Sequence, residues 1–370
     1  MGVSLRMKDW HTHVFTSTYT ADVSGVCSML YELGGMTVLH DPSGCNSTYT
    51  THDEPRWYDS KSLMFISGLD EMTAVLGDDS VLIRDVVKAA EDLKPRFITL
   101  CGASIPHIIA FDYRGAAKLI EKETGIPVLP VATDGLRSYV SGCGLAMKAW
   151  IRRFGNKQAE KIPGRVNILG VTPIDFSRSE NAEAMRRAFE EEGFSVRVFA
   201  MNETFEALQE VYQAECNIVV SAAGRSPAQY LWKTAGIPYV EGLPSGRDMV
   251  RKIADAVRTG KCTSVCQDYD PDGRTLVIGE EIFACTLASQ LHGQPLWPDV
   301  DEGLDEDVLL EKMEQADRII ADPLFQYGRR GDAAFIPFPH EGYSGRIFRK
   351  DIPVFTGNEF DIERYIRERK

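Results

Sequence analysis

The chain has 370 residues, 44% of them apolar, and its 41 basic and 54 acidic residues give a net charge of −13. This length and composition are typical of a globular protein of two or three domains, and the acidic balance, without a block of Lys and Arg, argues against nucleic-acid binding. Because residues 1–20 lack a leader-like apolar stretch and no later run reaches the roughly 20 apolar residues of a membrane helix, we expect a cytoplasmic protein with no membrane partner.

Two cysteines follow short apolar runs early in the chain. A predicted strand over residues 36–40 leads through a turn with Pro and Gly to Cys45, and a second predicted strand over residues 97–101 ends at Cys101. Both runs have the length and β-branched content of buried parallel strands. Since the carboxyl ends of such strands form the sheet edge where ligands collect, we expect both thiols at that edge. Two thiols there, in a chain with too few cysteines for a disulfide scaffold, suggest a metal site.

Cys27 belongs to a predicted helix over residues 24–33, which two glycines end. It is either a core thiol or a further ligand near the start of the helix, where the helix dipole would favour a thiolate. The other cysteines are assigned to packing (Cys143, Cys216 and Cys285) or to a weak C-x3-C metal signal (Cys262 and Cys266).

A unit of strand, turn, helix and strand recurs along the chain. It covers residues 97–131, begins again at residue 217, and returns in shorter form over residues 318–337. Such alternation predicts right-handed parallel crossovers with helices on both faces of each sheet. A polar linker over residues 155–164 and an acidic turn over 268–273 suggest boundaries. We therefore predict an α/β fold of three Rossmann-like, doubly wound domains with parallel sheets, over residues 1–160, 161–270 and 271–370.

Polar loops supply candidates for binding a substrate or delivering protons. These candidates are His52, Asp53, Arg56, Arg225 and His340. Each stands beside a predicted strand or turn, and each could equally belong to an ordinary solvated loop. The sequence has neither a phosphate-binding G-x-x-x-x-G-K-[ST] motif nor a complete G-x-G-x-x-G motif after a strand. If the protein reduces a substrate, its electrons must come from another protein.

Several segments together resemble the nitrogenase component 1 proteins. They are residues 27–79, with the His40-Asp41-Pro42-Ser43-Gly44-Cys45 motif, residues 100–104, residues 217–246 and residues 339–346. The resemblance extends over nearly all of the chain after residue 20. It implies three Rossmann-like domains, a homodimer or a heterodimer with a related subunit, an iron–sulfur cluster at the subunit interface, and electrons from an ATP-hydrolysing iron protein.

The resemblance also assigns roles to particular residues. Cys45 and Cys101 match the second and third cluster cysteines of the family, whereas the first falls near Thr20 or Ala21, with Cys27 about two helical turns further on. A [4Fe–4S] cluster needs four thiolates, which two chains would supply by each contributing Cys45 and Cys101. Ala223 stands where nitrogenase has the cysteine that anchors its catalytic cofactor. The resemblance therefore implies that dinitrogen is not the substrate.

Two functions follow as hypotheses. The first is the catalytic component of a two-component, ATP-dependent reductase whose interface cluster passes electrons to a tetrapyrrole or small organic substrate. The second is a non-catalytic scaffold or carrier that holds a metallocofactor during its assembly. Neither the motifs nor the charge pattern identifies the substrate.

Overall fold

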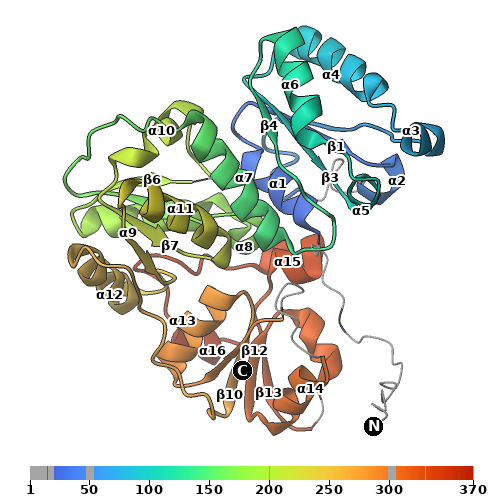
Figure 1. Ribbon diagram of the computed structural model, residues 1–370. Coiled ribbons are helices and arrows are strands. Elements are labelled where there is room, and N and C mark those ends of the chain that lie inside the picture. Colours follow the sequence, from blue (N-terminus) through green and yellow to red (C-terminus); the bar gives the residue numbers. More distant parts are fainter. Residues whose placement is uncertain are drawn as a thin grey trace, which may run out of the picture.

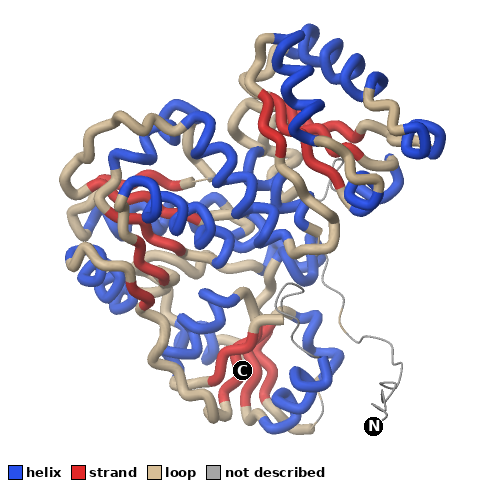
Figure 2. The backbone as a smooth tube through the Cα atoms, viewed as in Figure 1, coloured by secondary structure: helices blue, strands red, loops and turns tan. Residues whose placement is uncertain are grey.

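The computed structural model describes residues 15, 21–46, 54–199, 201–298, 306–329 and 331–369, and for residues 45 and 46 the backbone alone. The predicted site residues His52 and Asp53 lie outside the described residues. The chain forms three lobes, each built around its own parallel sheet (Figures 1 and 2). The predicted class of three Rossmann-like α/β domains is confirmed, while the exact domain boundaries stay a prediction.

The N-terminal sheet has the strand order β2-β1-β3-β4, with every pair parallel. Its strands are β1 (Met36–His40), β2 (Leu63–Ile66), β3 (Ile98–Gly102) and β4 (Val128–Pro130). The helices of this part are α1 (Asp22–Leu30), α2 (Ser43–Asn46), α3 (Glu71–Leu76), α4 (Ser80–Leu93), α5 (Ser104–Ile108), α6 (Tyr113–Thr124) and α7 (Tyr139–Phe154). Helices α4 and α6 pack on one face, and α1 and α7 on the other. The short helices α2, α3 and α5 lie at the carboxyl edge of the sheet (Figure 1).

The middle sheet has the order β6-β5-β7-β8-β9. Its strands are β5 (Arg165–Leu169), β6 (Ser195–Val198), β7 (Cys216–Val219), β8 (Tyr239–Glu241) and β9 (Thr263–Ser264). Its helices are α8 (Pro173–Phe176), α9 (Ser179–Glu191), α10 (Phe205–Gln209), α11 (Arg225–Ala235) and α12 (Arg247–Arg258), with the 3-10 turns η2 (Glu210–Gln213) and η3 (Ala222–Gly224). Helix α7 also packs against α11, so one long helix connects the cores of the first two sheets.

The C-terminal sheet has the order β11-β10-β12-β13. Its strands are β10 (Thr275–Ile278), β11 (Gln294–Leu296), β12 (Arg318–Ala321) and β13 (Ala334–Pro337). The accompanying helices are α13 (Glu281–Leu291), α14 (Glu306–Gln315), α15 (Glu341–Ser344) and α16 (Ile362–Arg367), with the 3-10 turns η4 (Pro323–Gly328) and η5 (Gly345–Asp351). Helix α15 contacts α8, which brings the third sheet against the second. Every helix in the described ranges is too short or too polar to cross a bilayer.

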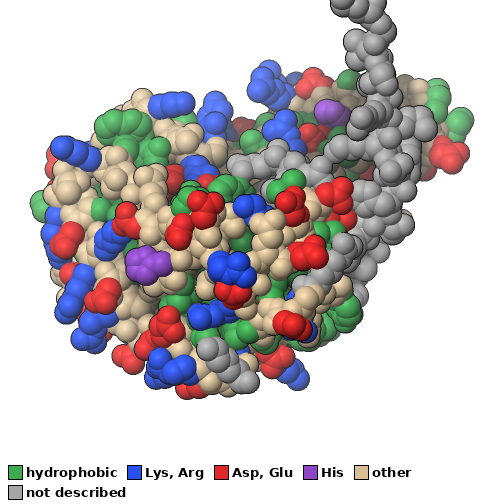
Figure 3. Space-filling model, turned by 90° about the horizontal axis from the view of Figure 1, so that it is seen from below, with side chains coloured by type: hydrophobic (Ala, Val, Ile, Leu, Met, Phe, Trp, Pro, Cys, Tyr) green, Lys and Arg blue, Asp and Glu red, His purple; other side chains and the backbone are tan. Residues whose placement is uncertain are grey.

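Glycine lets α1 and α7 approach to backbone contact. A Cβ atom on Gly25 would lie 2.0 Å from the carbonyl oxygen of Tyr139, and one on Gly142 would lie 1.8 Å from that of Asp22. No side chain fits at such distances, so the two helices cross where each has a glycine. This crossing places Cys27 and Cys143 in the core beneath the first sheet. Elsewhere the surface mixes both charges, as on the face shown in Figure 3.

Candidate functional site

The two cysteines predicted as cluster ligands follow neighbouring strands. Cys101 is the fourth residue of β3, and Cys45 lies in α2, directly after β1. Strands β1 and β3 pair in register, with His40 opposite Gly102, so both backbones reach the same sheet edge. The Cys101 side chain is fully buried, and its Sγ lies 3.9 Å from the carbonyl oxygen of Val38. The described backbone thus agrees with the predicted placement at the edge.

Cys27 lies in α1 against Cys101. A hydrogen bond between the two thiols, followed in importance by burial, raises the pKa of Cys27 well above its ordinary value. Cys143 on α7 is buried too, and its thiol donates to the carbonyl oxygen of Gly25 at 3.3 Å. Burial raises the pKa of Cys143. In this arrangement Cys27 and Cys143 are protonated thiols packed in the core.

The described thiols do not complete a metal site. Where the structure describes side chains, no group of three or more His, Cys, Asp or Glu could hold a metal ion. Cys27 and Cys101 supply two soft sulfur donors next to each other, whereas an iron–sulfur cluster of four irons needs four thiolates. Their chemistry fits iron–sulfur ligation, and the remaining ligands would have to come from Cys45 or a second chain.

Exposed apolar side chains surround this edge. On α3 the exposed fractions are 69% for Met72, 82% for Val75 and 69% for Leu76, and on α5 Ile108 is 74% exposed. Helix α3 has no buried residue at all. We call these four residues the edge patch. Exposed apolar side chains that gather on neighbouring elements are typical of interaction surfaces.

A second group of ionisable side chains is buried where the three sheets meet. It consists of Tyr139 from α7, Asp175 from α8, Glu280 before α13 and His340 before α15, and we call it the junction cluster. The hydroxyl of Tyr139 donates to Asp175 Oδ1 at 2.6 Å. His340 Nε2 lies 3.5 Å from the same oxygen and has no hydrogen-bond partner among the described residues. Four ionisable side chains are thus buried together at this junction.

Burial controls protonation in the junction cluster. It raises the pKa of Glu280 to about 8, with the negative charge of Asp175 contributing, although Ala222 N and Phe283 N donate to its carboxylate. Burial also raises the pKa of Tyr139 far above its ordinary value. Near neutral pH Glu280 therefore holds a proton that it can give up. Its hydrogen-bond donor Ala222 directly precedes Ala223 in the sequence. Perturbed acids of this kind are typical of functional sites.

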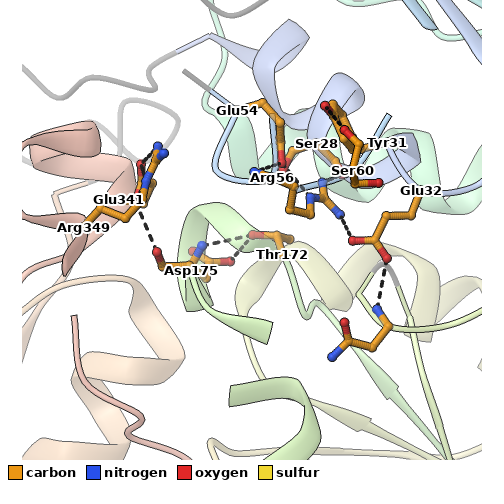
Figure 4. A network of polar contacts seen from close by, with 12 residues as sticks. Ser28, Tyr31, Glu32, Glu54, Arg56, Ser60, Thr172, Asp175, Glu341 and Arg349 are labelled. Atoms are coloured by element: carbon orange, nitrogen blue, oxygen red, sulfur yellow. Dashed lines mark hydrogen bonds and ion pairs between the residues drawn. The ribbon is translucent and has the colours of Figure 1, made fainter. Parts of the chain in front are cut away.

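The positions of His340 and Asp175 are fixed by local structure. Gly342 N donates to His340 Nδ1 at 3.0 Å, and His340 N donates to Asp322 Oδ2 at 2.7 Å. Asp175 accepts from the hydroxyl of Thr172 at 3.1 Å. Beside them, the Arg349 guanidinium pairs with Glu341, which also accepts from Ser177 (Figure 4). The imidazole is thereby oriented with Nδ1 occupied and Nε2 toward Asp175.

Arg56 and Arg225, predicted as candidates for binding a substrate or delivering protons, make ion pairs within the chain. Arg56 Nε donates to Glu54 Oε1 at 2.6 Å, and its Nη1 to Glu32 Oε1 at 2.8 Å (Figure 4). Arg225 Nε donates to Glu241 Oε1 at 2.9 Å, and its Nη1 donates to Glu281 Oε2 at 2.6 Å. The ion pairs of Arg225 join the middle and C-terminal domains. In this structure both guanidinium groups hold the protein's own carboxylates.

An open cleft of about 910 Å³ adjoins the network of Figure 4. Arg56, Ser177 and Arg349 line it, together with Arg178 before the first turn of α9. Ser177 and Arg349 contact Glu341, the residue after His340. The cleft therefore lies beside the buried Glu341, which follows His340 in the sequence.

Sequence reasoning missed three members of the junction cluster: Tyr139, Asp175 and Glu280. The Thr172-Pro173-Ile174-Asp175 run has the spacing of a helix N-cap, with Thr172 accepting from Asp175 N at 3.1 Å. That signal predicts a helix start and says nothing about proton chemistry. The other two stand alone in the sequence, and only the approach of three domains brings them to His340.

Comparison with known proteins gives one family. Residues 27–260 match the family described as nitrogenase component 1 type oxidoreductase. The chain is 25% identical over 229 residues to the nitrogenase iron–molybdenum cofactor biosynthesis protein NifE of Clostridium pasteurianum, covering 59% of this chain and 49% of that protein. It is 26% identical over 190 residues to one subunit of the light-independent protochlorophyllide reductase of Methylobacterium radiotolerans, covering 49% of this chain and 35% of the relative. The chain thus spans half or less of the length of these relatives.

Solved structures agree at the level of the fold. A structure of nitrogenase Cp1 at pH 6.5 matches with a TM-score of 0.72 and 15% identity, covering 98% of this chain and 93% of the other. A structure of nitrogenase Cp1 at pH 5 matches with a TM-score of 0.58. The family match extends over more than half of the sequence and agrees with the three parallel sheets. The chain therefore belongs to the nitrogenase component 1 type oxidoreductase family.

Proposed function

We propose that this chain is the catalytic component of a two-component reductase. It receives electrons from an ATP-dependent iron protein through a [4Fe–4S] cluster between two chains, and it reduces a tetrapyrrole or small organic substrate. Cys45 and Cys101 of each chain hold the cluster, which supplies one-electron transfer when bound. Cys27, whose thiol contacts Cys101, is the alternative ligand.

The edge patch supports a cluster shared between chains. Helices α3 and α5 flank α2, which carries Cys45, at the carboxyl edge of the sheet (Figure 1). A second chain that covers Met72, Val75, Leu76 and Ile108 removes these side chains from water, at about 25 cal/mol for each Å² of apolar surface. It also brings two further thiols to the edge. The partner is a second copy of this chain or a related subunit.

The junction cluster is the observation that favours an enzyme over a scaffold. Reduction of a carbon–carbon double bond consumes two electrons and two protons, so a reductase needs proton donors at its substrate. Glu280, protonated near neutral pH, and Tyr139 carry protons at this site, and His340 Nε2 lies beside Asp175 as a further group that can hold one. We place the substrate in the cleft lined by Ser177 and Arg349, both of which contact Glu341 next to His340.

Ala223 supports the exclusion of dinitrogen. It is fully buried at the start of the turn between β7 and α11, and a methyl group there cannot ligate a metal. His52 and Asp53, which lie outside the described residues, stay in the proposal as candidates from the sequence alone. Arg56 and Arg225 join it only if the substrate displaces their carboxylate partners.

Iron analysis tests the cluster. Protein purified without oxygen should contain about four irons per dimer, and Cys45→Ser or Cys101→Ser should remove them, because a hard hydroxyl replaces a soft thiolate. Cys262→Ser, at an exposed cysteine of the middle domain, is the matched control and should keep the iron. Colourless protein after anaerobic reconstitution would exclude the cluster.

Turnover separates the two functions. With an iron protein, MgATP and a strong reductant, the wild-type protein should reduce its substrate, and Asp175→Asn should slow reduction while the iron content stays unchanged. The control Asp134→Asn changes a half-buried aspartate in the loop between β4 and α7, where it pairs with Arg137. A scaffold would release a bound cofactor without turnover and would be insensitive to Asp175→Asn; the relative NifE is named as a cofactor biosynthesis protein.

A further inference from the structure

Five of the six charged residues that line a groove between α6, α7 and β4 are cations. The groove has a volume of about 890 Å³. Its charged lining residues are the cations Arg114, Lys118, Lys122, Arg152 and Arg153 and the single carboxylate of Glu121. This local excess of positive charge occurs in a chain whose net charge is −13. None of the lining residues belongs to the junction cluster, and the proposed reaction does not use the groove.

The one carboxylate of the groove is already engaged. Glu121 Oε1 accepts from Arg153 Nη2 at 2.7 Å, and Glu121 Oε2 accepts from the backbone N of Val128 at 2.9 Å. Throughout the described parts of the chain, no carboxylate pairs with Arg114, Lys118, Lys122 or Arg152. Four cations of the groove are therefore not neutralised by a carboxylate of the described residues and can bind an anionic ligand.

The spacing of the cations on α6 destabilises the helix. Arg114, Lys118 and Lys122 repeat every four residues, so they lie on one face at intervals of about 6 Å. Like charges at this spacing destabilise a helix by roughly 0.2–0.5 kcal/mol per pair. Lys122 and Arg152 lie in last turns, where the helix dipole favours cations. Arg114 and Lys118 have no such structural use.

The floor of the groove is apolar, and its edge does not accept a further strand. Val128, Leu129 and Pro130 of β4 form the floor with Ala117 and Ala149. Strand β4 is an edge strand, yet the N–H of Val128 is already bound to Glu121 and Pro130 has no N–H to donate. Addition of a peptide strand is therefore disfavoured. A small molecule with an apolar body and several negative charges fits both the floor and the walls.

We infer that this groove binds an organic polyphosphate, of the class of nucleoside di- and triphosphates. Linked phosphates spread several charges over a length comparable with the stripe on α6, so one molecule can contact more than one cation. Arginine forks bind phosphate oxygens in pairs, and Arg114 and Arg152 approach the groove from two helices. The base and ribose lie on the apolar floor. The phosphates are bound without being cleaved, and no reaction step is implied.

Binding measurements on the purified wild-type chain test this inference. Isothermal titration with ATP and ADP should give saturable binding that weakens as salt is added, because exposed charges are screened. The double variant Arg114→Ala/Lys118→Ala should bind ATP at least about tenfold more weakly, equivalent to about 1.4 kcal/mol. Lys233→Ala, at an exposed lysine in the last turn of α11, is the matched control and should bind normally.

Three results would overturn the inference: no saturable binding of ATP, equal binding by the double variant, or tighter binding of citrate than of ATP. Equal affinity for tripolyphosphate would refute the part assigned to the apolar floor. Thermal unfolding of the double variant without ligand shows that it is folded. Because iron content and turnover are not measured here, failure of this test is distinct from failure of the proposed reductase function.

Discussion

Replacement of Arg56 by methionine separates a structural role from a role in substrate binding. The guanidinium group donates from Nε to Glu54, from Nη1 to Glu32, and from Nη2 to the carbonyl oxygen of Ser28 at 2.6 Å. The Glu54 side chain is fully buried, and that of Arg56 is only 9% exposed. The substitution keeps most of the apolar volume of the side chain but removes a cation from two carboxylates.

The expected loss of stability is large. Breaking a buried ion pair by removing one partner costs about 3–5 kcal/mol, because the remaining charge stays in the interior. In a domain of 150–250 residues each kcal/mol shifts the melting temperature by about 2–4 °C, so Arg56→Met should melt roughly 10 °C below the wild-type protein. The measurements are thermal and urea unfolding followed by circular dichroism.

A second substitution provides the control. Glu54→Gln in the Arg56→Met background removes the buried negative charge and should restore part of the lost stability, because burial of an uncharged amide is far less unfavourable. The assignment of Arg56 to a structural ion pair is wrong if Arg56→Met has the same melting temperature as the wild-type protein. It is also wrong if adding Glu54→Gln lowers the stability of the Arg56→Met variant further. A loss of turnover at unchanged stability would instead return Arg56 to the substrate site.

Further expected outcomes concern helix packing, pH and the buried thiols. Gly25→Ala should lower the free energy of unfolding by about 1–3 kcal/mol or prevent folding, because its methyl group overlaps the carbonyl oxygen of Tyr139. Wild-type stability in urea unfolding would contradict the close contact between helices α1 and α7. Because burial raises the pKa of Glu280 to about 8 in the folded state, against 4.5 as its ordinary value, the folded state binds more protons between these values. Stability should therefore be fully present at low pH, fall as pH rises toward 8, and fall less steeply in Glu280→Gln; equal slopes would contradict the raised pKa. Cys27→Ala should leave the electron paramagnetic resonance spectrum of the reduced cluster unchanged if Cys27 only packs, and should alter it if Cys27 is a ligand.

The correspondence between sequence and structure is closest for the strands. The runs predicted over residues 36–40 and 97–101 form β1 (Met36–His40) and β3 (Ile98–Gly102), because short β-branched segments between Pro and Gly have few alternatives in an α/β chain. The predicted helix over residues 24–33 begins two residues earlier, at Asp22. Its start carries no side-chain cap, and a helix without a capping residue gives no sharp signal for its first turn.

Burial could be predicted for some candidate residues and not for others. Cys143, assigned to packing from its glycine neighbours, is fully buried as expected. The polar context of Arg56 suggested a solvated loop, whereas the side chain is buried against Glu54 and Glu32. A charged residue shows in the sequence only its type, and its partners lie on elements that fold separately.

The amino-acid sequence alone determines the alternation of strands and helices and the family resemblance. It also predicts that Cys45 and Cys101 follow neighbouring strands, because these features depend on local patterns and on parallel topology. The meeting of Tyr139, Asp175, Glu280 and His340 depends on how the domains pack. These residues come from four elements that are far apart in the chain, and the raised pKa values of Tyr139 and Glu280 depend on burial and on the charge of Asp175. The burial of these four ionisable side chains against one another is therefore a property of domain packing, which no local pattern encodes.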